Sequence, residues 1–498
     1  MTDSGENGIK DAMNVLMDDG NREQLAINKK IIFFAVVGVA LFLGILLSFR
    51  PLLVAGGVAF FGGLIVFLLK KEIAIYLIIL TLFFEADVFS FELYGARIRS
   101  SQIIASVALV VLLILFGSRK IQLKKTPLDI FLWMYIGINF LALKNSTSLN
   151  RSLKISILLL SLALLYYVVI NFVTTKELFL KVFKLMVFVG LAEIAYGLYQ
   201  VVAGMSNTYL GTGFSIGHSG IMQQEYLNSP WGRPYGTLFE PDWYGAIAMF
   251  FAILCLILYS FDPSKKRKLY LGGMILSLTG LFFSFVRASW VGFVCALVIL
   301  VIVRNIMKLK NVKFDILYKL SFLSLLMILL VFSFSPSVNS IIRQRLAVEA
   351  SPSTSIFPTR FITSKYAIKS FLKNPIFGNG PGSPIVEEGT EEYDEMVEKG
   401  LSSLVNLEYT YSLPVSLLTD TGVVGLLLFV LLFVKYVRFN IRNIPTLDSD
   451  FQIINFALFG GVLALFISYL ATNGLWIPFT WVFLALNVAG IKVAQEHS

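Results

Sequence analysis

Histidine and cysteine are almost absent from this sequence of 498 residues, which contains two of each. Because His218 and His497 are the only histidines, a histidine-rich metal site is excluded. Cys255 and Cys295 both lie inside apolar runs, where a free cysteine behaves as a small hydrophobic residue. The two cysteines therefore indicate neither a disulfide nor a metal-binding pair.

Charged residues are also scarce: they make up 14% of the chain, whereas hydrophobic residues make up 57%. This composition is typical of a polytopic membrane protein and excludes an ordinary soluble globular protein. The net charge of +10 then reports membrane orientation and not nucleic-acid binding. The start of the chain is polar and mixed in charge, and the first apolar run comes too late for a cleavable signal peptide.

The longest apolar stretch, Leu269–Val303, contains a single charge, Arg287. One straight helix of this length would reach roughly 50 Å, well beyond a hydrocarbon core of about 30 Å. Basic residues flank both ends, at Lys265–Lys268 and at Arg304, and such clusters mark the cytoplasmic side. The stretch is therefore predicted to be a two-span hairpin with Arg287 near its outer tip. Arg287 either snorkels to the interface or binds an anion in an outer cavity.

The same reasoning, applied to the whole chain, predicts an all-α polytopic membrane protein with about 12–14 transmembrane helices and both termini in the cytoplasm. The spans must be helices because irregular backbone cannot face lipid. The predicted order is a cytoplasmic tail (1–30), transmembrane helices 1–11 with an outer loop near 203–241 (31–334), a large extracytoplasmic loop containing short helices (335–413), and the last three transmembrane helices with a short cytoplasmic tail (414–498).

The predicted spans follow the apolar runs between alternating basic loops. They are Ile31–Phe49, Leu52–Leu69, part of Ile73–Phe91, Ile103–Phe116, Leu128–Leu143, Leu153–Phe172, Phe183–Val202, Trp243–Tyr259, the two arms of the hairpin, Ile316–Phe334, Pro414–Tyr436, Phe451–Leu470 and Leu475–Val493.

The first outer loop ends in a segment that runs from Arg233 through Tyr235, Glu240 and Asp242 to Trp243. It combines an arginine, two carboxylates and several aromatic rings beside the entrance of a span. Aromatic faces and carboxylates suit sugar rings, because the ring stacks on an aromatic face and its hydroxyls donate hydrogen bonds to a carboxylate. The alternative is an aromatic belt at the level of the lipid headgroups, with the proline before Asp242 simply starting a helix.

The second outer loop is predicted to contain two short helices, Val338–Val348 and Arg360–Leu372. The latter is amphipathic, so it either belongs to a small layer that the loop forms on its own or rests on anionic lipid. Asn374–Ser383 contains Gly-Asn-Gly-Pro-Gly, which forces tight turns and exposes backbone N–H groups to a candidate anion. It lacks the Gly-Lys-Ser/Thr ending of a nucleotide loop. The acidic segment Glu387–Glu398 indicates a solvated surface.

Three arginines are thus predicted on the outer side: Arg233, Arg287 and Arg360. Arginine grips phosphate with two parallel hydrogen bonds and keeps its charge in a partly dry site. A lipid substrate that carries phosphate would need such a clamp.

Four segments carry a resemblance to a known family. They are Arg233–Gly245, leading into a span; Ser284–Trp290, at the hairpin tip; Arg360–Ser383; and, more weakly, Asn406–Leu413 followed by Thr419–Gly425. In order, spacing and common side, this combination resembles the O-antigen ligase and O-antigen polymerase (Wzy-type) superfamily of membrane proteins.

The resemblance implies that the chain takes a glycan from an undecaprenyl diphosphate carrier at the outer face of the cytoplasmic membrane and joins it to an acceptor sugar. It implies no metal, nucleotide sugar or other cofactor, because the lipid diphosphate is the leaving group. The diphosphate and glycan would be bound by Arg233, Arg287, Arg360, Tyr235 and Asn406. Membrane lipid, a flippase and a chain-length regulator are the implied partners, and nucleic acid is not.

One departure concerns the general base. Family members commonly carry a histidine just before an asparagine that precedes the span predicted here at Pro414–Tyr436. In this chain that place is Val405, followed by Asn406. A carboxylate can replace the histidine if it reaches the acceptor hydroxyl, or His218 can fold in from the other loop. The candidate carboxylates are Glu240, Asp242 and Glu408.

The leading hypothesis is a polymerase that joins lipid-linked oligosaccharide repeat units into a cell-surface polysaccharide. A ligase, which transfers a finished glycan once, would give one transferred block in place of a ladder. A flippase or other transporter also suits about fourteen spans, but no clear internal repeat supports it. A non-catalytic scaffold for export would tolerate substitution of Arg233 and Arg287.

Overall fold

The computed structural model describes residues 61–85, 90–93, 96–205, 233–238, 240–261, 267–309, 356–384, 386, 390–391, 393–394 and 412–496. The chain divides into two units, residues 1–69 and residues 70–498. In the first unit, residues 61–69 are helical. The predicted spans Ile31–Phe49 and Ile316–Phe334 and the predicted helix Val338–Val348 lie outside the described residues.

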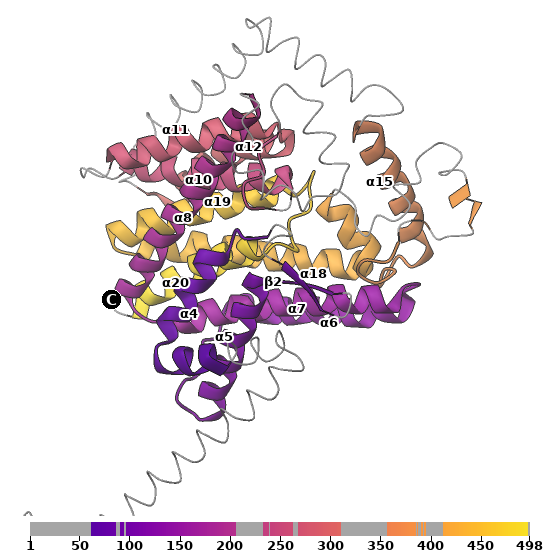
Figure 1. Ribbon diagram of the computed structural model, residues 1–498, viewed down its shortest axis with the longest axis horizontal. Coiled ribbons are helices and arrows are strands. Elements are labelled where there is room, and N and C mark those ends of the chain that lie inside the picture. Colours follow the sequence, from indigo (N-terminus) through magenta and orange to yellow (C-terminus); the bar gives the residue numbers. More distant parts are fainter. Residues whose placement is uncertain are drawn as a thin grey trace, which may run out of the picture. The chain divides into compact units, whose positions relative to one another are not determined.

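The second unit consists mainly of helices (Figure 1). Its described elements are α4 (Lys71–Thr81), β1 (Ser90–Leu93), β2 (Ala96–Arg99), α5 (Ser100–Gly117), α6 (Asp129–Ala142), η2 (Leu143–Asn145), α7 (Leu149–Phe172), α8 (Lys176–Met205), α10 (Pro241–Phe261), α11 (Arg267–Ser284), α12 (Arg287–Met307), α15 (Ile356–Lys373), α18 (Leu413–Asn443), η4 (Ile444–Thr446), α19 (Ser449–Ser468) and α20 (Pro478–Glu496).

The predicted fold class is confirmed: the chain is an all-α polytopic membrane protein. Five of the described helices are long and apolar enough to cross a membrane, namely α7, α10, α12, α18 together with η4, and α19. Their bounds agree with the predicted spans to within a few residues, except that α18 continues to Asn443, beyond the predicted end at Tyr436. For example, the predicted span Trp243–Tyr259 is α10, Pro241–Phe261. Long apolar runs bounded by charge define such helices well, because length and hydropathy alone determine them.

Helix α10 lies at the centre of the packing and contacts α8, α11, α12 and α19. Most of its side chains are buried, as expected for a helix that is apolar on every side. The Tyr244 hydroxyl donates a hydrogen bond of 2.8 Å to the backbone carbonyl of Ile194 in α8. The ring of Phe250 stacks on Phe483 of α20, with centroids 4.0 Å apart. These contacts fix the first half of α10 with respect to its neighbours.

Helices α11 and α12 form the predicted hairpin, which turns at Phe285 and Val286. The two arms pack less on each other than on other helices, since α11 contacts α10 and α8 while α12 contacts α19. Phe285 has a positive φ of 54°. Such a conformation is uncommon for a bulky residue, so the turn carries local strain next to Arg287.

An unpredicted β-hairpin follows α4. The first helix of this region ends at Thr81, and β1 pairs antiparallel with β2, with Glu92 opposite Arg97. The predicted outer loop between the third and fourth spans is therefore a short hairpin. The sequences Ser-Phe-Glu-Leu and Ala-Arg-Ile-Arg alternate polar and apolar residues, which is the period of a strand and not of a helix.

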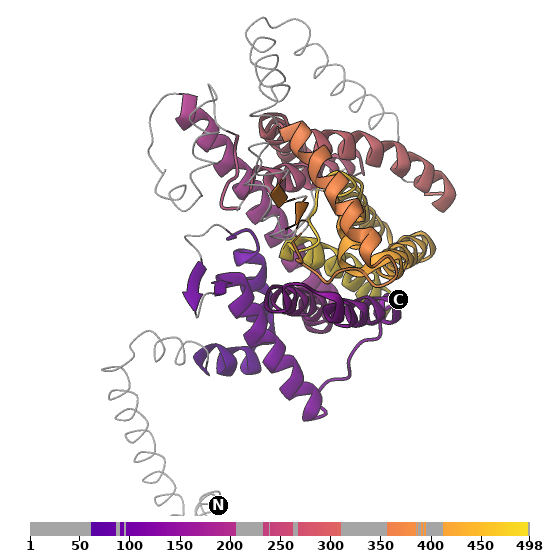
Figure 2. The ribbon, with the colours of Figure 1, turned by 90° about the vertical axis from the view of Figure 1, so that its right-hand side faces the viewer.

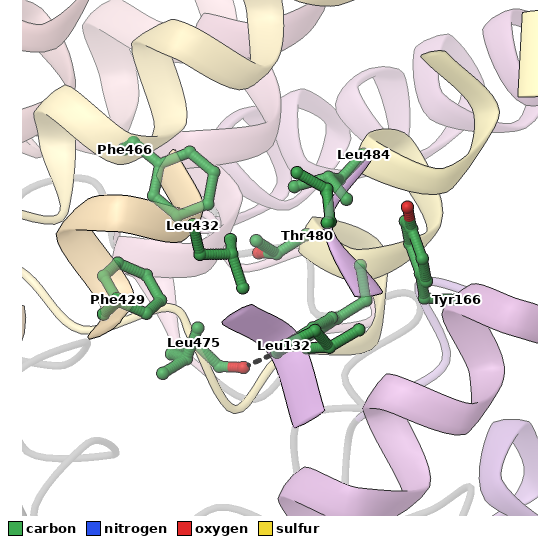
Figure 3. A pocket seen from close by; sticks show the side chains of 10 residues that line it. Leu132, Tyr166, Phe429, Leu432, Phe466, Leu475, Thr480 and Leu484 are labelled. Carbon is green, nitrogen blue, oxygen red and sulfur yellow. Dashed lines mark hydrogen bonds between the residues drawn. The ribbon is translucent and has the colours of Figure 1, made fainter. Parts of the chain in front are cut away.

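An apolar pocket lies among α6, α7, α18, α19, the α19–α20 connection and α20 (Figure 3). Its lining includes the rings of Phe429 and Phe466 and the side chain of Leu475. The Trp481 indole N–H donates a hydrogen bond of 2.7 Å to the Leu475 carbonyl, which anchors the α19–α20 connection to α20. This anchoring positions the turn that precedes α20.

Candidate functional site

Arg233 joins the start of α10 to the end of α11. Its Nε donates a hydrogen bond of 2.9 Å to the backbone carbonyl of Ser284, and its Nη2 lies 2.9 Å from Oδ1 of Asp242. The side chains of Arg233 and Asp242 are only 16% and 20% exposed, so the ion pair is largely shielded from solvent. Charge-assisted hydrogen bonds of this length are stronger than neutral ones, and they hold the two segments together.

The α11–α12 turn that Arg233 contacts is itself well ordered by hydrogen bonds. The Ser284 hydroxyl donates to the Leu281 carbonyl at 2.7 Å and accepts from the Val286 N–H at 3.2 Å. The indole N–H of Trp290 donates to the same Leu281 carbonyl at 2.8 Å. Arg287, an exposed residue, begins α12 three residues after the carbonyl that Arg233 binds. The structure thus brings the segments of two predicted arginines together.

Helix α8 holds the turn that follows Arg233. The Gln200 side chain accepts from the Gly236 N–H at 2.8 Å and from the Tyr235 N–H at 3.2 Å, and it donates to the Gly236 carbonyl at 2.9 Å. About two helical turns earlier in α8, Glu193 Oε1 accepts a hydrogen bond of 2.6 Å from the Thr237 N–H. Residues seven apart lie on one helix face, so both side chains point at the same turn.

The turn also contacts the segment after α4. The Thr237 hydroxyl lies 2.8 Å from Glu193 Oε2 and 2.9 Å from the Phe83 carbonyl, and the Glu85 N–H donates to the Thr237 carbonyl at 3.1 Å. Gly236 has a φ of 63°, and a Cβ there would lie 1.8 Å from Glu193 Oε1. Only glycine therefore fits this place. Tyr235, a predicted binding residue, is buried beside it.

Sequence reasoning missed Glu193 and Gln200. A signal for Glu193 was present, because a carboxylate inside a predicted span is costly unless it has partners. No comparable signal marks Gln200, since a lone amide in an apolar helix has no characteristic spacing.

A polar pocket lies where α10 begins, against the α19–α20 connection. Two of the predicted catalytic carboxylates, Glu240 and Asp242, line it. The remaining lining residues are Trp243, Ala246, Tyr469, Thr472, Asn473, Gly474 and Ile477. The structure therefore brings the two carboxylates and one tryptophan of the first predicted segment to a single pocket, and adds residues from a connection that the sequence did not single out.

A second site of contact joins the glycine-rich turn to α18. The predicted span Pro414–Tyr436 is a helix interrupted at Gly422, where φ is 67° and ψ is −167°. The backbone groups freed by this break pair with the turn after α15. The Asn379 N–H donates to the Thr419 carbonyl at 2.7 Å, and the Val423 N–H donates to the Pro375 carbonyl at 2.9 Å. Figure 2 shows α15 (orange), which contacts α18.

The N–H groups of the glycine-rich turn are used inside the protein. Those of Gly378 and Gly380 donate to the carbonyls of Asn374 and Asp420, at 2.9 and 3.0 Å. The buried Asp420 carboxylate accepts from the Ser416 hydroxyl at 3.0 Å and from the Gly382 backbone. These N–H groups therefore have a structural role in place of the predicted anion binding. The turn supplies hydrogen-bond partners to the backbone of α18 where the helix is interrupted at Gly422.

The remaining predicted site residues lie elsewhere. Arg360 lies in α15. Four further positions lie outside the described residues: the predicted binding residue Asn406, the predicted carboxylate Glu408, the alternative base His218 and the departure at Val405. Of the acidic segment Glu387–Glu398, only residues 390–391 and 393–394 are described.

These features define a polytopic helical membrane protein in which an arginine and a carboxylate connect the start of α10 to the α11–α12 turn. Residues 272–430 match the family model of the O-antigen ligase domain, Wzy_C. The predicted resemblance to the O-antigen ligase and polymerase type of membrane protein is confirmed over these residues, and the match supports a membrane glycan-transfer function. No curated protein matches the chain.

The matched residues begin within α11 and end within α18. They include the turn at Arg287, helix α15, the glycine-rich turn and the break at Gly422. Arg233 and the polar pocket lie outside the matched residues, but Arg233 is bonded directly to Ser284 within them.

Proposed function

We propose that the protein is a polymerase that joins undecaprenyl-diphosphate-linked oligosaccharide repeat units into a cell-surface polysaccharide. It would act at the outer face of the cytoplasmic membrane, with both termini in the cytoplasm. The observation that carries the proposal is the contact of Arg233 with both Asp242 and the turn that presents Arg287. The ion pair of Arg233 and Asp242 is thereby held beside the turn that presents Arg287.

Arg233 retains capacity for a phosphate ligand. A guanidinium has five N–H donors, and the described contacts use one on Nε and one on Nη2. The remaining donors and the exposed Arg287 suit the oxygens of a diphosphate, which arginine binds with two parallel hydrogen bonds. Positive charge aimed at these oxygens stabilises the negative charge that develops on the departing diphosphate.

In the proposed reaction the acceptor hydroxyl oxygen attacks the anomeric carbon of the donor sugar and forms a new C–O bond. The bond from that carbon to the diphosphate oxygen breaks, and its electron pair leaves with the lipid diphosphate. The hydroxyl proton passes to a carboxylate, and direct attack inverts the anomeric carbon. Because Arg233 engages one oxygen of Asp242, we assign the base to Glu240 and the positioning of Arg233 to Asp242. Glu408 stays a candidate.

The description of the matched family, O-antigen ligase, favours single transfer of a finished glycan as the second candidate function. The two functions share the donor and differ in the acceptor and in the number of transfers. Flippase and chain-length regulator proteins are proposed partners of the polymerase. No described feature favours a transporter.

The test is complementation of a strain that lacks this gene, with wild type, Arg287→Ala or the control Arg267→Ala. Arg267 is an exposed arginine at the opposite end of the same hairpin, where it stacks on Tyr259. We expect wild type and Arg267→Ala to restore a ladder of long chains, and Arg287→Ala to leave single repeat units. One block of fixed length in place of a ladder would favour the ligase. Long chains from Arg287→Ala would remove this arginine from the mechanism.

A further inference from the structure

The polar pocket at the start of α10 is built from two parts of the chain that are far apart in sequence. Glu240, Asp242 and Trp243 come from the start of α10, while Thr472 and Asn473 come from the α19–α20 connection. The space at this pocket that is not filled by atoms, counted together with the open solvent at its mouth, is about 340 Å³. Its polar lining contrasts with the apolar pocket of Figure 3, where Tyr166 and Thr480 are the few polar side chains.

Asn473 supplies this pocket with an oriented hydrogen-bond donor. Its Oδ1 accepts from the backbone N–H of Leu475 at 3.4 Å, which fixes the orientation of the amide. Its Nδ2 is buried and has no hydrogen-bond partner in the described part of the chain. Flipping the amide would place Nδ2 against the Leu475 N–H, so the orientation follows from chemistry. A buried donor without a partner in a pocket wall points to a ligand that supplies an oxygen.

Thr472 complements Asn473. Its hydroxyl hydrogen is donated to the Ser468 carbonyl at 3.1 Å, which leaves the oxygen lone pairs to accept a hydrogen bond. The opposite wall supplies the carboxylates of Glu240 and Asp242, which accept hydrogen bonds, and the indole of Trp243, which offers an apolar face. Donor, acceptors and aromatic face together match a sugar ring, whose hydroxyls both donate and accept and whose C–H face is apolar.

We propose that this pocket is the acceptor subsite, which binds the sugar whose hydroxyl attacks the donor. The inference rests on the proposed glycan-transfer function and adds to it Asn473, Thr472 and Trp243 as acceptor-binding residues. Asp242 supports this placement because it lines the pocket and also binds Arg233. One carboxylate therefore connects the acceptor subsite with the arginine proposed to hold the donor diphosphate.

The test uses purified full-length protein and two probes. The donor is the lipid-linked repeat unit extracted from a strain that lacks this gene. The acceptor is the single-repeat oligosaccharide released from that lipid and labelled at its reducing end. Incorporation of the label is measured against the concentration of each probe. For Asn473→Ala we expect the half-saturating acceptor concentration to rise roughly tenfold, as for one lost hydrogen bond, with the donor value unchanged.

Four further variants separate binding from folding. Asn473→Asp keeps the oxygen that accepts from the Leu475 N–H but removes the donor, so it should show the acceptor defect of Asn473→Ala. Trp243→Phe keeps an aromatic face and should retain more acceptor affinity than Trp243→Ala. Asn443→Ala is the control, because the Asn443 amide donates to the Phe439 carbonyl at the end of α18 and does not line the pocket.

The outcomes are distinct. A wild-type protein that forms no polymer from lipid-linked units counts against the proposed function itself. A wild-type protein that polymerises these units but never incorporates the free oligosaccharide overturns the acceptor subsite. The subsite is also overturned if Asn473→Asp behaves as wild type, or if the Asn473 variants change the donor value and not the acceptor value.

Discussion

Gly378 and Gly422 each leave room for the backbone that carries the other. A Cβ on Gly378 would lie 2.5 Å from the backbone of Asp420 and Thr421, and a Cβ on Gly422 would lie 2.3 Å from the Ile376 carbonyl oxygen. Both glycines also have positive φ, 74° and 67°. The close approach lets the turn after α15 pair with the break in α18, so two separated segments depend on two residues without side chains.

We therefore expect Gly378→Ala and Gly422→Ala each to destabilise the protein by at least about 1–2 kcal/mol, because strain and backbone overlap add. The measurement is the thermal unfolding midpoint in detergent. Gly272→Ala is the control: no atom lies within 4 Å of a Cβ at this helical position in α11. Alanine there should be neutral or stabilising by about 0.5–1 kcal/mol. Equal midpoints for all three variants would contradict the structural role of the paired glycines.

The extent of the helices could be predicted from the sequence, whereas their contacts could not. Hydropathy defines α10 because a long apolar run has one stable form in lipid. The break at Gly422 depends on hydrogen bonds from a segment more than forty residues earlier, which no local pattern encodes. The contact of Arg233 with a carbonyl and the donor role of Asn473 likewise arise only after distant segments meet. For the candidate site, the sequence thus predicted the arginine and the carboxylates but not the groups that they contact.

Glu193 is expected to hold the turn at Thr237 through both carboxylate oxygens, one bonded to the backbone N–H and the other to the hydroxyl. In Glu193→Gln, the amide oxygen still accepts from the Thr237 N–H and the new Nε2 donates to the Thr237 hydroxyl oxygen, whose hydrogen then goes to Phe83. Glu193→Ala leaves the Thr237 N–H without its partner. We expect Glu193→Gln to keep most activity and Glu193→Ala to lose stability by about 1–3 kcal/mol together with activity.

The readouts for these variants are the thermal midpoint and the chain-length ladder after complementation. Gln200→Ala should resemble Glu193→Ala, because it releases the same turn at Gly236. An active Glu193→Ala protein with an unchanged midpoint would show that α8 does not hold the Arg233 segment as described.

Asp420 is expected to matter as the acceptor of two hydrogen bonds. Asp420→Ala removes the partner of the Ser416 hydroxyl and of the Gly382 backbone, and we expect a loss of about 1–3 kcal/mol. Ser416→Ala removes one donor and leaves the carboxylate bonded to Gly382, so its cost should be smaller. The check is the difference between the two thermal midpoints. A larger effect of Ser416→Ala would contradict the assignment of Asp420 as the organiser of the glycine-rich turn.

Arg233 and Asp242 should be energetically coupled, because they form a largely shielded ion pair with an N–O distance of 2.9 Å. A double-mutant cycle with Arg233→Ala and Asp242→Ala should give a coupling energy of roughly 1–3 kcal/mol in stability. Arg233→Lys should also fail to restore long chains. A single ammonium group cannot reproduce the rigid fork that spans Asp242 and the Ser284 carbonyl. Arg267→Lys is the matched control.

Kinetics of the same cycle separate the two roles of Asp242. If Asp242 served only to position Arg233, then the double variant would show the same half-saturating donor and acceptor concentrations as Arg233→Ala. Because Asp242 also lines the polar pocket, we expect Asp242→Ala to raise the half-saturating concentrations of both donor and acceptor. Arg233→Ala should raise chiefly the donor value. Identical profiles for the two single variants would remove Asp242 from the acceptor subsite and leave it with the arginine alone.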